Sequence, residues 1–293
     1  MSKYKANLNL KDKNNTLTNI FIRVKKNSKI LDVGCASGYF DKVLKEKKGC
    51  SIVGIEIDKE DAKEAEKYCD QVIVADVESQ DWERKLTIKK FNHIIFADLL
   101  EHLREPEKLL ERVKKYLSNQ GSILVSIPNI AHVSIRLELL KGDFIPEETG
   151  ILDNTHLKYF TKDSFLNIAK QVGFDAKWVS QSSFDFPKEQ IEKYLSGMGL
   201  KVKREALENL NSSDAVALQY IFELVPGEIS KTDKMEEKPI YVARQFLESV
   251  EKEKKNEIEA LKKEIKHLRE EASRNQGLLT YKLERKLRRL LKK

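Results

Sequence analysis

The strongest constraint on the fold is a regular alternation of short apolar runs with amphipathic stretches through the first half of the chain. Five apolar runs rich in Ile and Val are typical of buried strands: 29–34, 51–58, 71–77, 91–100 and 121–129. Helical patterns such as YFDKVLKEKK and EPEKLLERVKKYL separate them. Because strands that alternate with helices are joined by crossovers, the pattern predicts a parallel, doubly wound sheet of the α/β class.

Two more strands are expected beyond this region. The segment TKDSFLNIAKQVGF opens with Thr161 as a helix cap and reaches Gly173 as a stop, so it predicts a helix. The apolar runs AKWVSQS and VALQYIFELV then have the composition of strands. We therefore expect a Rossmann-like sheet of seven strands that ends in an antiparallel pair, within a domain formed by residues 1–226.

A different composition follows this domain. Residues 227–239 are polar and lack apolar periodicity, which is typical of a linker, and residues 240–293 form a charged helical extension. Apolar residues in the extension recur at steps of three and four, the heptad spacing of a coiled coil: Ile258, Leu261, Ile265, Leu268 and Ala272. We expect a homo-oligomer formed through this helix, and a single solvated helix is the alternative.

The net charge of +7 is concentrated at the two ends of the chain. Residues 1–29 hold eight Lys and Arg against one acid, and residues 276–293 hold seven against one. A nucleic-acid enzyme usually has a basic stripe around its site, so this distribution disfavours a nucleic-acid partner. In the C-terminal tip, Leu283, Leu287, Leu290 and Leu291 lie at helical spacing among basic residues. The tip is expected to contact an anionic membrane or an acidic partner, or to be the solvated end of the coiled coil.

Apolar runs and cysteines indicate the compartment. No run approaches the roughly 18 apolar residues of a membrane span, and residues 1–15 lack the apolar stretch of a signal peptide. Cys35, Cys50 and Cys69 are odd in number and show no CxxC spacing, so neither a disulfide framework nor a zinc site is indicated. We expect a cytoplasmic protein without a metal, peripheral at the inner membrane face if the tip binds lipid.

The first predicted strand runs into a glycine turn, LDVGCASGYF. Gly34 and Gly38 bracket two small side chains, so a ligand can approach the backbone closely and face the amides of the next helix. The turn does not match GxGxxG, which makes a dinucleotide fingerprint a poor fit.

Acidic residues stand in or at the end of four successive predicted strands: Asp32, Glu56, Asp76 and Asp98. Ligands of open α/β sheets bind at this carboxyl edge, where an acid such as Glu56 suits ribose hydroxyls and Asp76 suits an adenine amino group. A single one of these acids would be read as a loop carboxylate or a helix cap. Four in phase predict a nucleotide-type ligand.

The set LDVGCASG, GIEID, VADVE, FADLLEHLREPEKLL and GSILVSIPN resembles the class I S-adenosylmethionine-dependent methyltransferases over about residues 25–225. The resemblance implies S-adenosyl-L-methionine above the first two strand ends. It further implies ten cofactor-binding residues: Asp32, Gly34, Cys35 (through its backbone) and Gly38 at the methionine moiety, Glu56 at ribose, Ile57, Asp76 and Val77 at adenine, and Asp98 and Leu99 beside the sulfonium. Ala36 departs from the glycine that many members have, which tightens the turn.

The segment from PNIAHVSIRLELLKGDF to GILDNTHLKYFT is similar to methyltransferases encoded with glycosyltransferases for bacterial surface polysaccharides, in which a D-x-T-H loop follows the fifth strand. This likeness implies a glycan, nucleotide-linked sugar or sugar phosphate as acceptor, and glycosyltransferases as partners. Two alternatives remain at this point. One is a methyltransferase for another small molecule or a protein, and the other is a coiled-coil scaffold with a vestigial methyltransferase core.

A sugar hydroxyl is a poor nucleophile at neutral pH and benefits from a general base. The candidates are His102, His132 and His156, with Asp153 and Glu101 as orienting carboxylates. His156 is favoured, because Asp153 could fix its tautomer within a loop over the carboxyl edge. The alternatives are structural: His102 packs within its helix, His132 caps the next one, and Asp153 forms an Asx turn.

Overall fold

The computed structural model describes residues 8–227, 241–274 and 288, and the chain divides into two compact units, Met1–Ser230 and Lys231–Lys293. Each unit is described by itself. Apart from Gly227, the predicted linker lies outside the described residues, as does the basic tip apart from Arg288. The expectations for these two segments therefore stay predictions.

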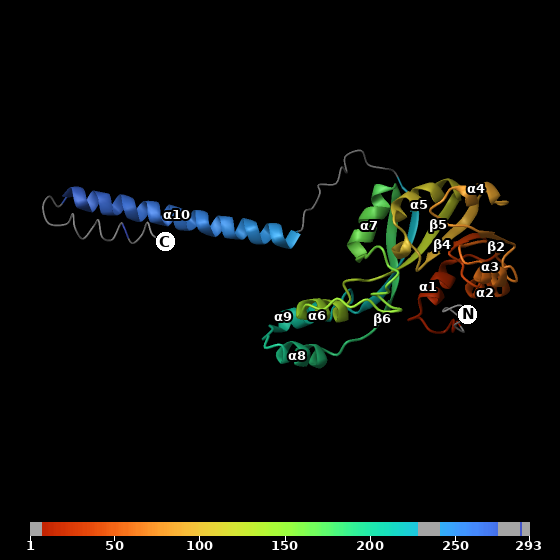
Figure 1. Ribbon diagram of the computed structural model, residues 1–293, viewed down its shortest axis with the longest axis horizontal. Helices are drawn as coiled ribbons and strands as arrows, with labels where there is room; N and C mark the ends of the chain where they lie inside the picture. Colours follow the sequence, from red (N-terminus) through yellow and green to blue (C-terminus); the bar gives the residue numbers. More distant parts are fainter. Residues whose placement is uncertain (1–7, 228–240, 275–287, 289–293) are drawn as a thin grey trace. The chain divides into compact units, whose positions relative to one another are not determined.

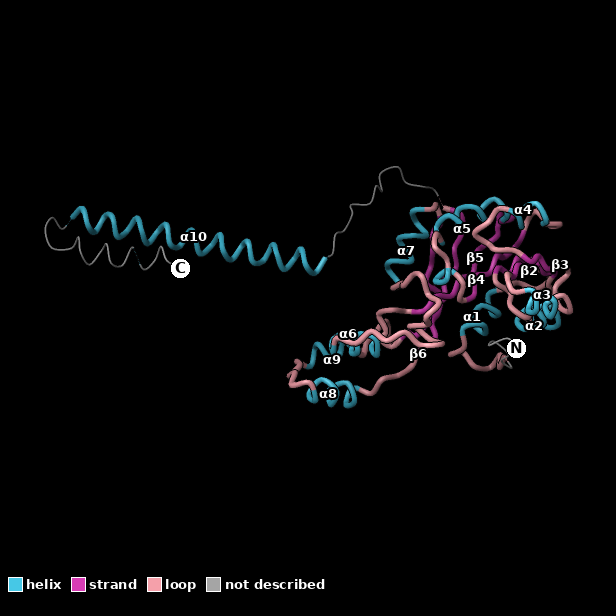
Figure 2. The backbone as a smooth tube through the Cα atoms, in the orientation of Figure 1, coloured by secondary structure: helices cyan, strands magenta, loops and turns pink. Residues whose placement is uncertain are grey.

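Seven strands form one sheet in the first unit (Figures 1 and 2). Their bounds are β1 (Lys29–Val33), β2 (Ser51–Glu56), β3 (Gln71–Val74), β4 (Phe91–Ala97), β5 (Leu117–Pro128), β6 (Phe174–Ser183) and β7 (Ala217–Pro226). The order across the sheet is β3-β2-β1-β4-β5-β7-β6, and β1 to β5 pair in parallel. Strand β7 is antiparallel to both β5 and β6. The expected seven-stranded Rossmann-like fold is confirmed.

The strand order reverses direction at β1, which pairs with β2 on one side and with β4 on the other. Asp32 of β1 stands opposite Gly54 of β2 and Ile95 of β4. The helices that follow β1 and β4 leave on opposite faces of the sheet, so the carboxyl ends of these two strands diverge into a crevice. Ligands of open α/β sheets bind at such a switch point.

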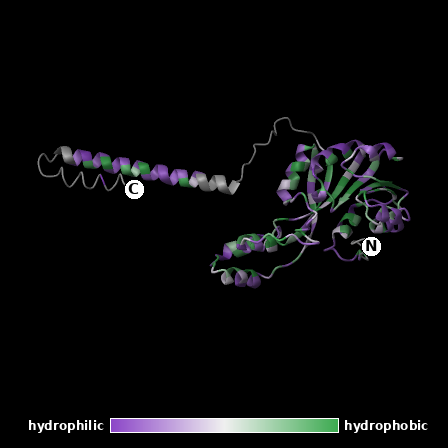
Figure 3. Ribbon diagram, in the orientation of Figure 1, coloured by the Kyte–Doolittle hydropathy of each residue, from purple (hydrophilic) through white to green (hydrophobic). Residues whose placement is uncertain are grey.

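Two hydrophobic cores cover the two faces of the sheet, and Figure 3 shows hydrophobic residues running through the strands. One core is packed by α4 (Asp81–Lys85), α5 (Pro106–Val113) and α7 (Lys162–Gln171). The other is packed by α1 (Thr16–Arg23), α2 (Tyr39–Lys48) and α3 (Lys59–Ala65). Two short 3-10 helices, η1 (Leu100–His102) and η2 (Lys114–Tyr116), flank α5. Because both faces are covered, the strands read as continuous apolar runs.

A third, smaller core joins α6 (Val133–Lys141), α8 (Lys188–Gly197) and α9 (Arg204–Leu210). Figure 1 shows these helices grouped beyond one end of the sheet, although α6 follows β5 and the other two lie between β6 and β7. Val133 and Leu137 of α6 pack there with Ile191 and Leu195 of α8. This group extends the carboxyl edge of the sheet beside the crevice.

The second unit contains α10 (Tyr241–Arg274), which confirms the expected C-terminal helix. Along its predicted heptad positions, Ile258 is 52% exposed and Leu268 is 7% exposed. Pairing of this helix with a second chain stays a prediction. Within the described residues, none of the helices combines the length and apolar character needed to cross a bilayer.

Candidate functional site

A cavity of about 550 Å³ opens at the carboxyl ends of β1 and β4. Six of the ten residues expected to bind cofactor line it: Asp32, Gly34, Cys35, Glu56, Asp98 and Leu99. They come from β1 and the turn after it, from the end of β2, and from the segment after β4. The fold therefore brings together residues that are spread over 68 positions of the sequence, from Asp32 to Leu99 inclusive.

The turn after β1 depends on glycine at both of its ends. Gly34 has a φ of +78°, and a Cβ built on it would lie 3.1 Å from Cδ1 of Leu99 at the cavity wall. Gly38 has a φ of +72°, and its Cβ would lie 2.8 Å from Cα of Ala65. Gly34 therefore keeps the cavity floor open, which fits a ligand held against the backbone. Gly38 does not line the cavity and instead lets α2 start close against α3.

Glu56 closes the same turn from β2. Its Oε2 accepts a hydrogen bond of 2.9 Å from the N–H of Ala36, and its Oε1 accepts bonds from the N–H groups of Ile57 and Asp58. A carboxylate has about four acceptor positions, so capacity for a ligand hydroxyl remains. Glu56 lies at the cavity wall while only 9% exposed, which fits the predicted ribose contact.

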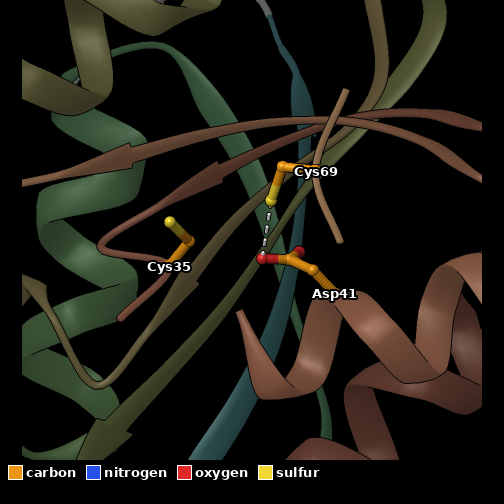
Figure 4. A group of neighbouring side chains, drawn as sticks. All are labelled: Cys35, Asp41 and Cys69. Atoms are coloured by element: carbon orange, nitrogen blue, oxygen red, sulfur yellow. Dashed lines mark hydrogen bonds between the residues drawn. The ribbon is translucent and has the colours of Figure 1, made fainter. Parts of the chain in front are cut away.

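Buried acids and thiols lie behind the turn. Cys69 donates a hydrogen bond of 3.3 Å to Asp41, and Cys35 lies beside them (Figure 4). Burial raises the pKa of both Asp32 and Asp41 well above the usual range. Although its hydrogen bond with Cys69 acts in the opposite direction, burial and the nearby carboxyl charges raise the pKa of Cys35. The thiol is therefore protonated. Cys35 lines the cavity because it lies in the turn after β1.

The three residues predicted to contact adenine lie outside the cavity. Ile57, Asp76 and Val77 do not line it. Ile57 is 66% exposed, whereas Val77 is buried in the core and Asp76 accepts a hydrogen bond from the N–H of Glu78. An exposed isoleucine next to Glu56 is compatible with packing on a base, so the adenine assignment stays a prediction.

Several cavity residues were missed by the sequence reasoning, chiefly Asn14, Asn15, Thr16 and Leu17 at the start of α1. The hydroxyl of Thr16 bonds the side chain of Gln219 from β7, also a lining residue, at 2.5 Å. Asn15 caps α1, and this cap was the only available signal. A cap predicts where a helix begins but not which strands it covers.

Asp98 occupies the strained position after β4, with a φ of +52°. Its Oδ1 accepts a hydrogen bond of 2.7 Å from Ser126, and its own N–H donates to the same hydroxyl. Protein atoms surround it on most sides and raise its pKa by desolvation, yet its side chain is exposed at the cavity surface. A non-glycine residue held in this backbone region is a frequent mark of a functional site.

The loop of residues 150–161 is fastened to η1. The carbonyl of Glu101 accepts hydrogen bonds from the N–H groups of Leu157 and Lys158, at 2.8 and 2.9 Å. This attachment brings the ring of His156 to 4.8 Å from the ring of His102, measured between centroids. His102 lines the cavity, whereas His156 does not line it and lies against His102.

The hydrogen bonds of the two rings define their tautomers. Nδ1 of His156 lies 3.1 Å from the carbonyl oxygen of Ile151, which can only accept, so Nδ1 carries the proton. Nδ1 of His102 lies 3.1 Å from the Thr155 hydroxyl, whose own hydrogen is donated to Asp153. His102 therefore donates as well. In the neutral form both rings keep an unprotonated Nε2.

Asp153 does not orient His156 directly, which corrects the expected pair. Its Oδ1 accepts from the N–H and the hydroxyl of Thr155, at 2.8 and 2.5 Å. This is the alternative Asx-type turn, and it positions His102 through Thr155. Burial and the neighbouring His102 lower the pKa of His156, which keeps that ring neutral at neutral pH.

Glu101 lies beneath the two histidines and is 1% exposed. Burial raises its pKa well above the usual range, and the charges of Asp98 and Asp153 act in the same direction. Its Oε2 has no hydrogen-bond partner among the described residues.

The structure does not bring His132 to the cavity. Its ring caps α6, where Nδ1 accepts from the N–H of Ser134, and the residue is 2% exposed. Desolvation lowers its pKa. Among the histidines expected to act in catalysis, His102 and His156 are therefore the pair that the fold brings together.

The chain is similar in sequence to known proteins. A family model described as a methyltransferase domain matches residues 9–177, more than half of the chain. An uncharacterized protein of Methanocaldococcus jannaschii is 26% identical over 212 residues, 72% of this chain and 75% of the relative.

The chain is also similar to two solved structures. An S-adenosylmethionine-dependent methyltransferase from Archaeoglobus fulgidus is 18% identical, with a TM-score of 0.47 over 70% of this chain and 89% of that chain. A chain in the Haloferax volcanii complex of the Trm112 methyltransferase activator with a methyltransferase is 14% identical, with a TM-score of 0.47 over 73% and 89%.

Proposed function

The chain belongs to the methyltransferase-domain family, and we propose that it transfers a methyl group from S-adenosylmethionine to a hydroxyl oxygen of a saccharide, a sugar phosphate or a nucleotide-linked sugar. The observation that carries the proposal is the contact between a histidine of the cofactor cavity, His102, and a second histidine, His156. Glu56 and the Gly34 turn form one side of this site. His102 lines it as well, and His156 packs against His102.

Residues of the cavity would hold the cofactor in the following way. Glu56 would bind the ribose hydroxyls, the backbone from Gly34 to Ala36 would face the methionine moiety, and Asp98 with Leu99 would flank the sulfonium. Bound S-adenosylmethionine supplies an electrophilic methyl group, so holding an acceptor in line with it provides much of the rate. The remaining task of the protein is to orient the acceptor oxygen and to let its proton leave.

The acceptor side suits a polar ring compound. In their neutral forms, His102 and His156 would each offer Nε2 to a hydroxyl group, because Nδ1 of each ring is bonded within the protein. Next to them, Tyr159 is 40% exposed and packs edge-to-face with Phe144, which is 46% exposed, at a centroid distance of 5.9 Å. His156 itself lies 6.2 Å from the Tyr159 ring. An exposed aromatic surface beside hydrogen-bonding groups supports a sugar acceptor, which has one apolar face and several hydroxyls.

The wider setting belongs to the same proposal. The likeness of the D-x-T-H segment to polysaccharide-associated methyltransferases supports a role in surface glycan assembly, with glycosyltransferases or an anionic inner-membrane surface near the C-terminal tip.

The candidate catalytic residues have different roles in this proposal. His156 and His102 act on the acceptor, Asp153 acts through Thr155, and His132 only caps α6.

A transfer assay with radiolabelled methyl groups tests the acceptor class. Full-length enzyme and labelled S-adenosylmethionine are incubated separately with nucleotide sugars, sugar phosphates, glycan oligosaccharides, proteins and small amines. Label that enters a sugar-containing pool in an ether linkage, stable to mild base, supports the proposal. Label confined to the protein or amine pools would assign the enzyme to a different acceptor class.

A further inference from the structure

Three potential metal ligands converge where η1 meets the loop of residues 150–161. Glu101, His102 and His156 each offer one ligand atom, and these atoms lie within 4.8 Å of one another. Two of the residues are adjacent in sequence and the third is 54 positions after His102. The hydrogen bonds from Leu157 and Lys158 to the carbonyl of Glu101 hold the two segments together.

The two histidines have the hydrogen bonds that metal-binding imidazoles usually have. Histidine ligands commonly donate the other ring N–H to a carbonyl, a carboxylate or a similar acceptor, which fixes ring orientation and tautomer. Nδ1 of His156 bonds the Ile151 carbonyl, and Nδ1 of His102 bonds Thr155. Thr155 in turn donates to Asp153, so a carboxylate stands behind His102. Each ring is therefore set to present Nε2 as a lone-pair donor.

Glu101 supplies an independent observation. Its carboxyl is 1% exposed, and Oε2 has no donor among the described residues. Buried oxygen atoms without a partner are uncommon, and a bound ion is one of the recognised explanations.

We propose that Glu101, His102 and His156 bind a divalent cation of the Mn²⁺, Co²⁺ or Zn²⁺ kind, which in turn holds the acceptor hydroxyl. Two imidazoles and one carboxylate suit these borderline cations and leave coordination positions open. No metal was expected from the sequence, because the three ligands form no spaced motif and meet only through tertiary folding. The inference rests on the proposed function for the identity of the acceptor but not for the site itself.

The cation would act as a Lewis acid on the hydroxyl oxygen and lower the pKa of its proton. In the transfer the O–H bond breaks and the proton passes to water, a new O–CH₃ bond forms, and the C–S bond breaks with its electron pair staying on sulfur. No electron is gained or lost overall, so a cation without redox chemistry suffices. His156 then acts through the cation rather than as a free general base.

Direct binding of Mn²⁺ tests the site without any acceptor. Full-length protein is stripped with EDTA, dialysed and titrated with MnCl₂, and free Mn²⁺ is followed by its electron paramagnetic resonance signal. We expect one saturable site per chain. Glu101→Gln, His102→Ala and His156→Ala should each weaken binding at least about tenfold, and Thr155→Val should weaken it by about 10–100-fold as the loss of an outer partner.

Two variants serve as controls. His267→Ala removes an exposed histidine of α10, and His132→Ala removes the buried cap of α6. Both should bind Mn²⁺ as the wild type does. Each ligand variant is also titrated with S-adenosylhomocysteine, and retained affinity shows that the cofactor cavity is still folded.

Two outcomes would overturn the site: no saturable Mn²⁺ binding, or binding that the three ligand variants leave unchanged. Methyl transfer that proceeds at the full rate in EDTA would overturn the role of the cation in catalysis. These failures differ from failure of the proposed function. A protein that binds Mn²⁺ through these residues but methylates no sugar would retain the cation site and lose the sugar as its acceptor.

Discussion

The N–H of Ala36 donates a hydrogen bond of 2.9 Å to Oε2 of Glu56, so the acid expected to bind ribose also holds the glycine turn together. Ala36 has a φ of +46°, a backbone region that alanine rarely adopts. One carboxylate thus has two tasks, to shape the turn and to face the cofactor. Cofactor affinity and the stability of the turn are therefore coupled at Glu56.

Glu56→Ala should weaken binding of S-adenosylhomocysteine and also lower the free energy of unfolding. The N–H of Ala36 would lose its acceptor, which costs about 1–3 kcal/mol where water cannot replace it. Glu56→Gln keeps one acceptor oxygen and should lose less stability. Calorimetric titration and urea denaturation measure the two effects, and unchanged affinity in both variants would contradict the ribose assignment.

Ala36→Gly should stabilise the protein. Glycine adopts positive φ without the Cβ clash that costs other residues about 1–2 kcal/mol, and it keeps the N–H that bonds Glu56. Part of this gain is offset by the greater entropy of glycine in the unfolded chain. We expect a net rise of up to about 1 kcal/mol in the free energy of unfolding. Thermal denaturation followed by circular dichroism checks it, and a lower midpoint than wild type would show that Ala36 is not strained.

Asp41→Asn should change how stability depends on pH. Burial raises the pKa of Asp41 in the folded protein above its usual value of 3.8, so the folded state binds its proton more tightly than the unfolded state. Such a group increases the free energy of unfolding at pH values below its usual pKa, and this stabilisation is lost as the pH rises through the folded-state pKa. The variant lacks this loss, so its stability relative to wild type should increase with pH above about 4.

Urea denaturation between pH 4 and pH 8 measures this difference. Asp81→Asn, at an exposed position in the first turn of α4, is the matched control and should follow the wild-type profile. A constant offset between Asp41→Asn and wild type over the whole range would mean that Asp41 is ionised throughout.

Removal of residues 228–293 should leave the first unit folded. The chain divides into two compact units at Ser230, and the cofactor cavity lies entirely within the first unit. The thermal midpoint and the affinity for S-adenosylhomocysteine should therefore match those of the full chain. If the heptad positions of α10 pair between chains, light scattering should show an oligomer for the full chain and a monomer for the truncated one. If the truncated protein keeps the oligomeric state of the full chain, the interface lies in the first unit and not in α10.

Most of the fold was predictable because buried parallel strands have a local signature. All seven strands were expected near their observed positions, and Thr161 does cap α7 with a capping box. The start of β5 was missed by four residues, since Leu117 joins the sheet by pairing with Phe91 and the polar residues 118–120 hide the strand. Local composition does not reveal an extension that only a neighbouring strand stabilises.

Of the candidate site, only the residues at the carboxyl ends of the strands could be predicted from the sequence. Gly34, Glu56 and Asp98 could be placed because parallel strands bring their carboxyl ends to one edge. The neighbourhood of His102 and His156 depends on two hydrogen bonds to the carbonyl of Glu101, a contact across more than fifty residues. For the same reason Thr155, rather than His156, proved to be the partner of Asp153.

The most direct test of the central claim, that catalysis occurs where η1 meets the loop of residues 150–161, is the single-turnover rate of His156→Ala with cofactor and sugar acceptor both saturating. We expect a loss of about 10²–10⁴-fold relative to wild type, with little change in affinity for S-adenosylhomocysteine. His132→Ala should transfer methyl at close to the wild-type rate. A His156→Ala variant that transfers methyl as fast as the wild type would contradict the account.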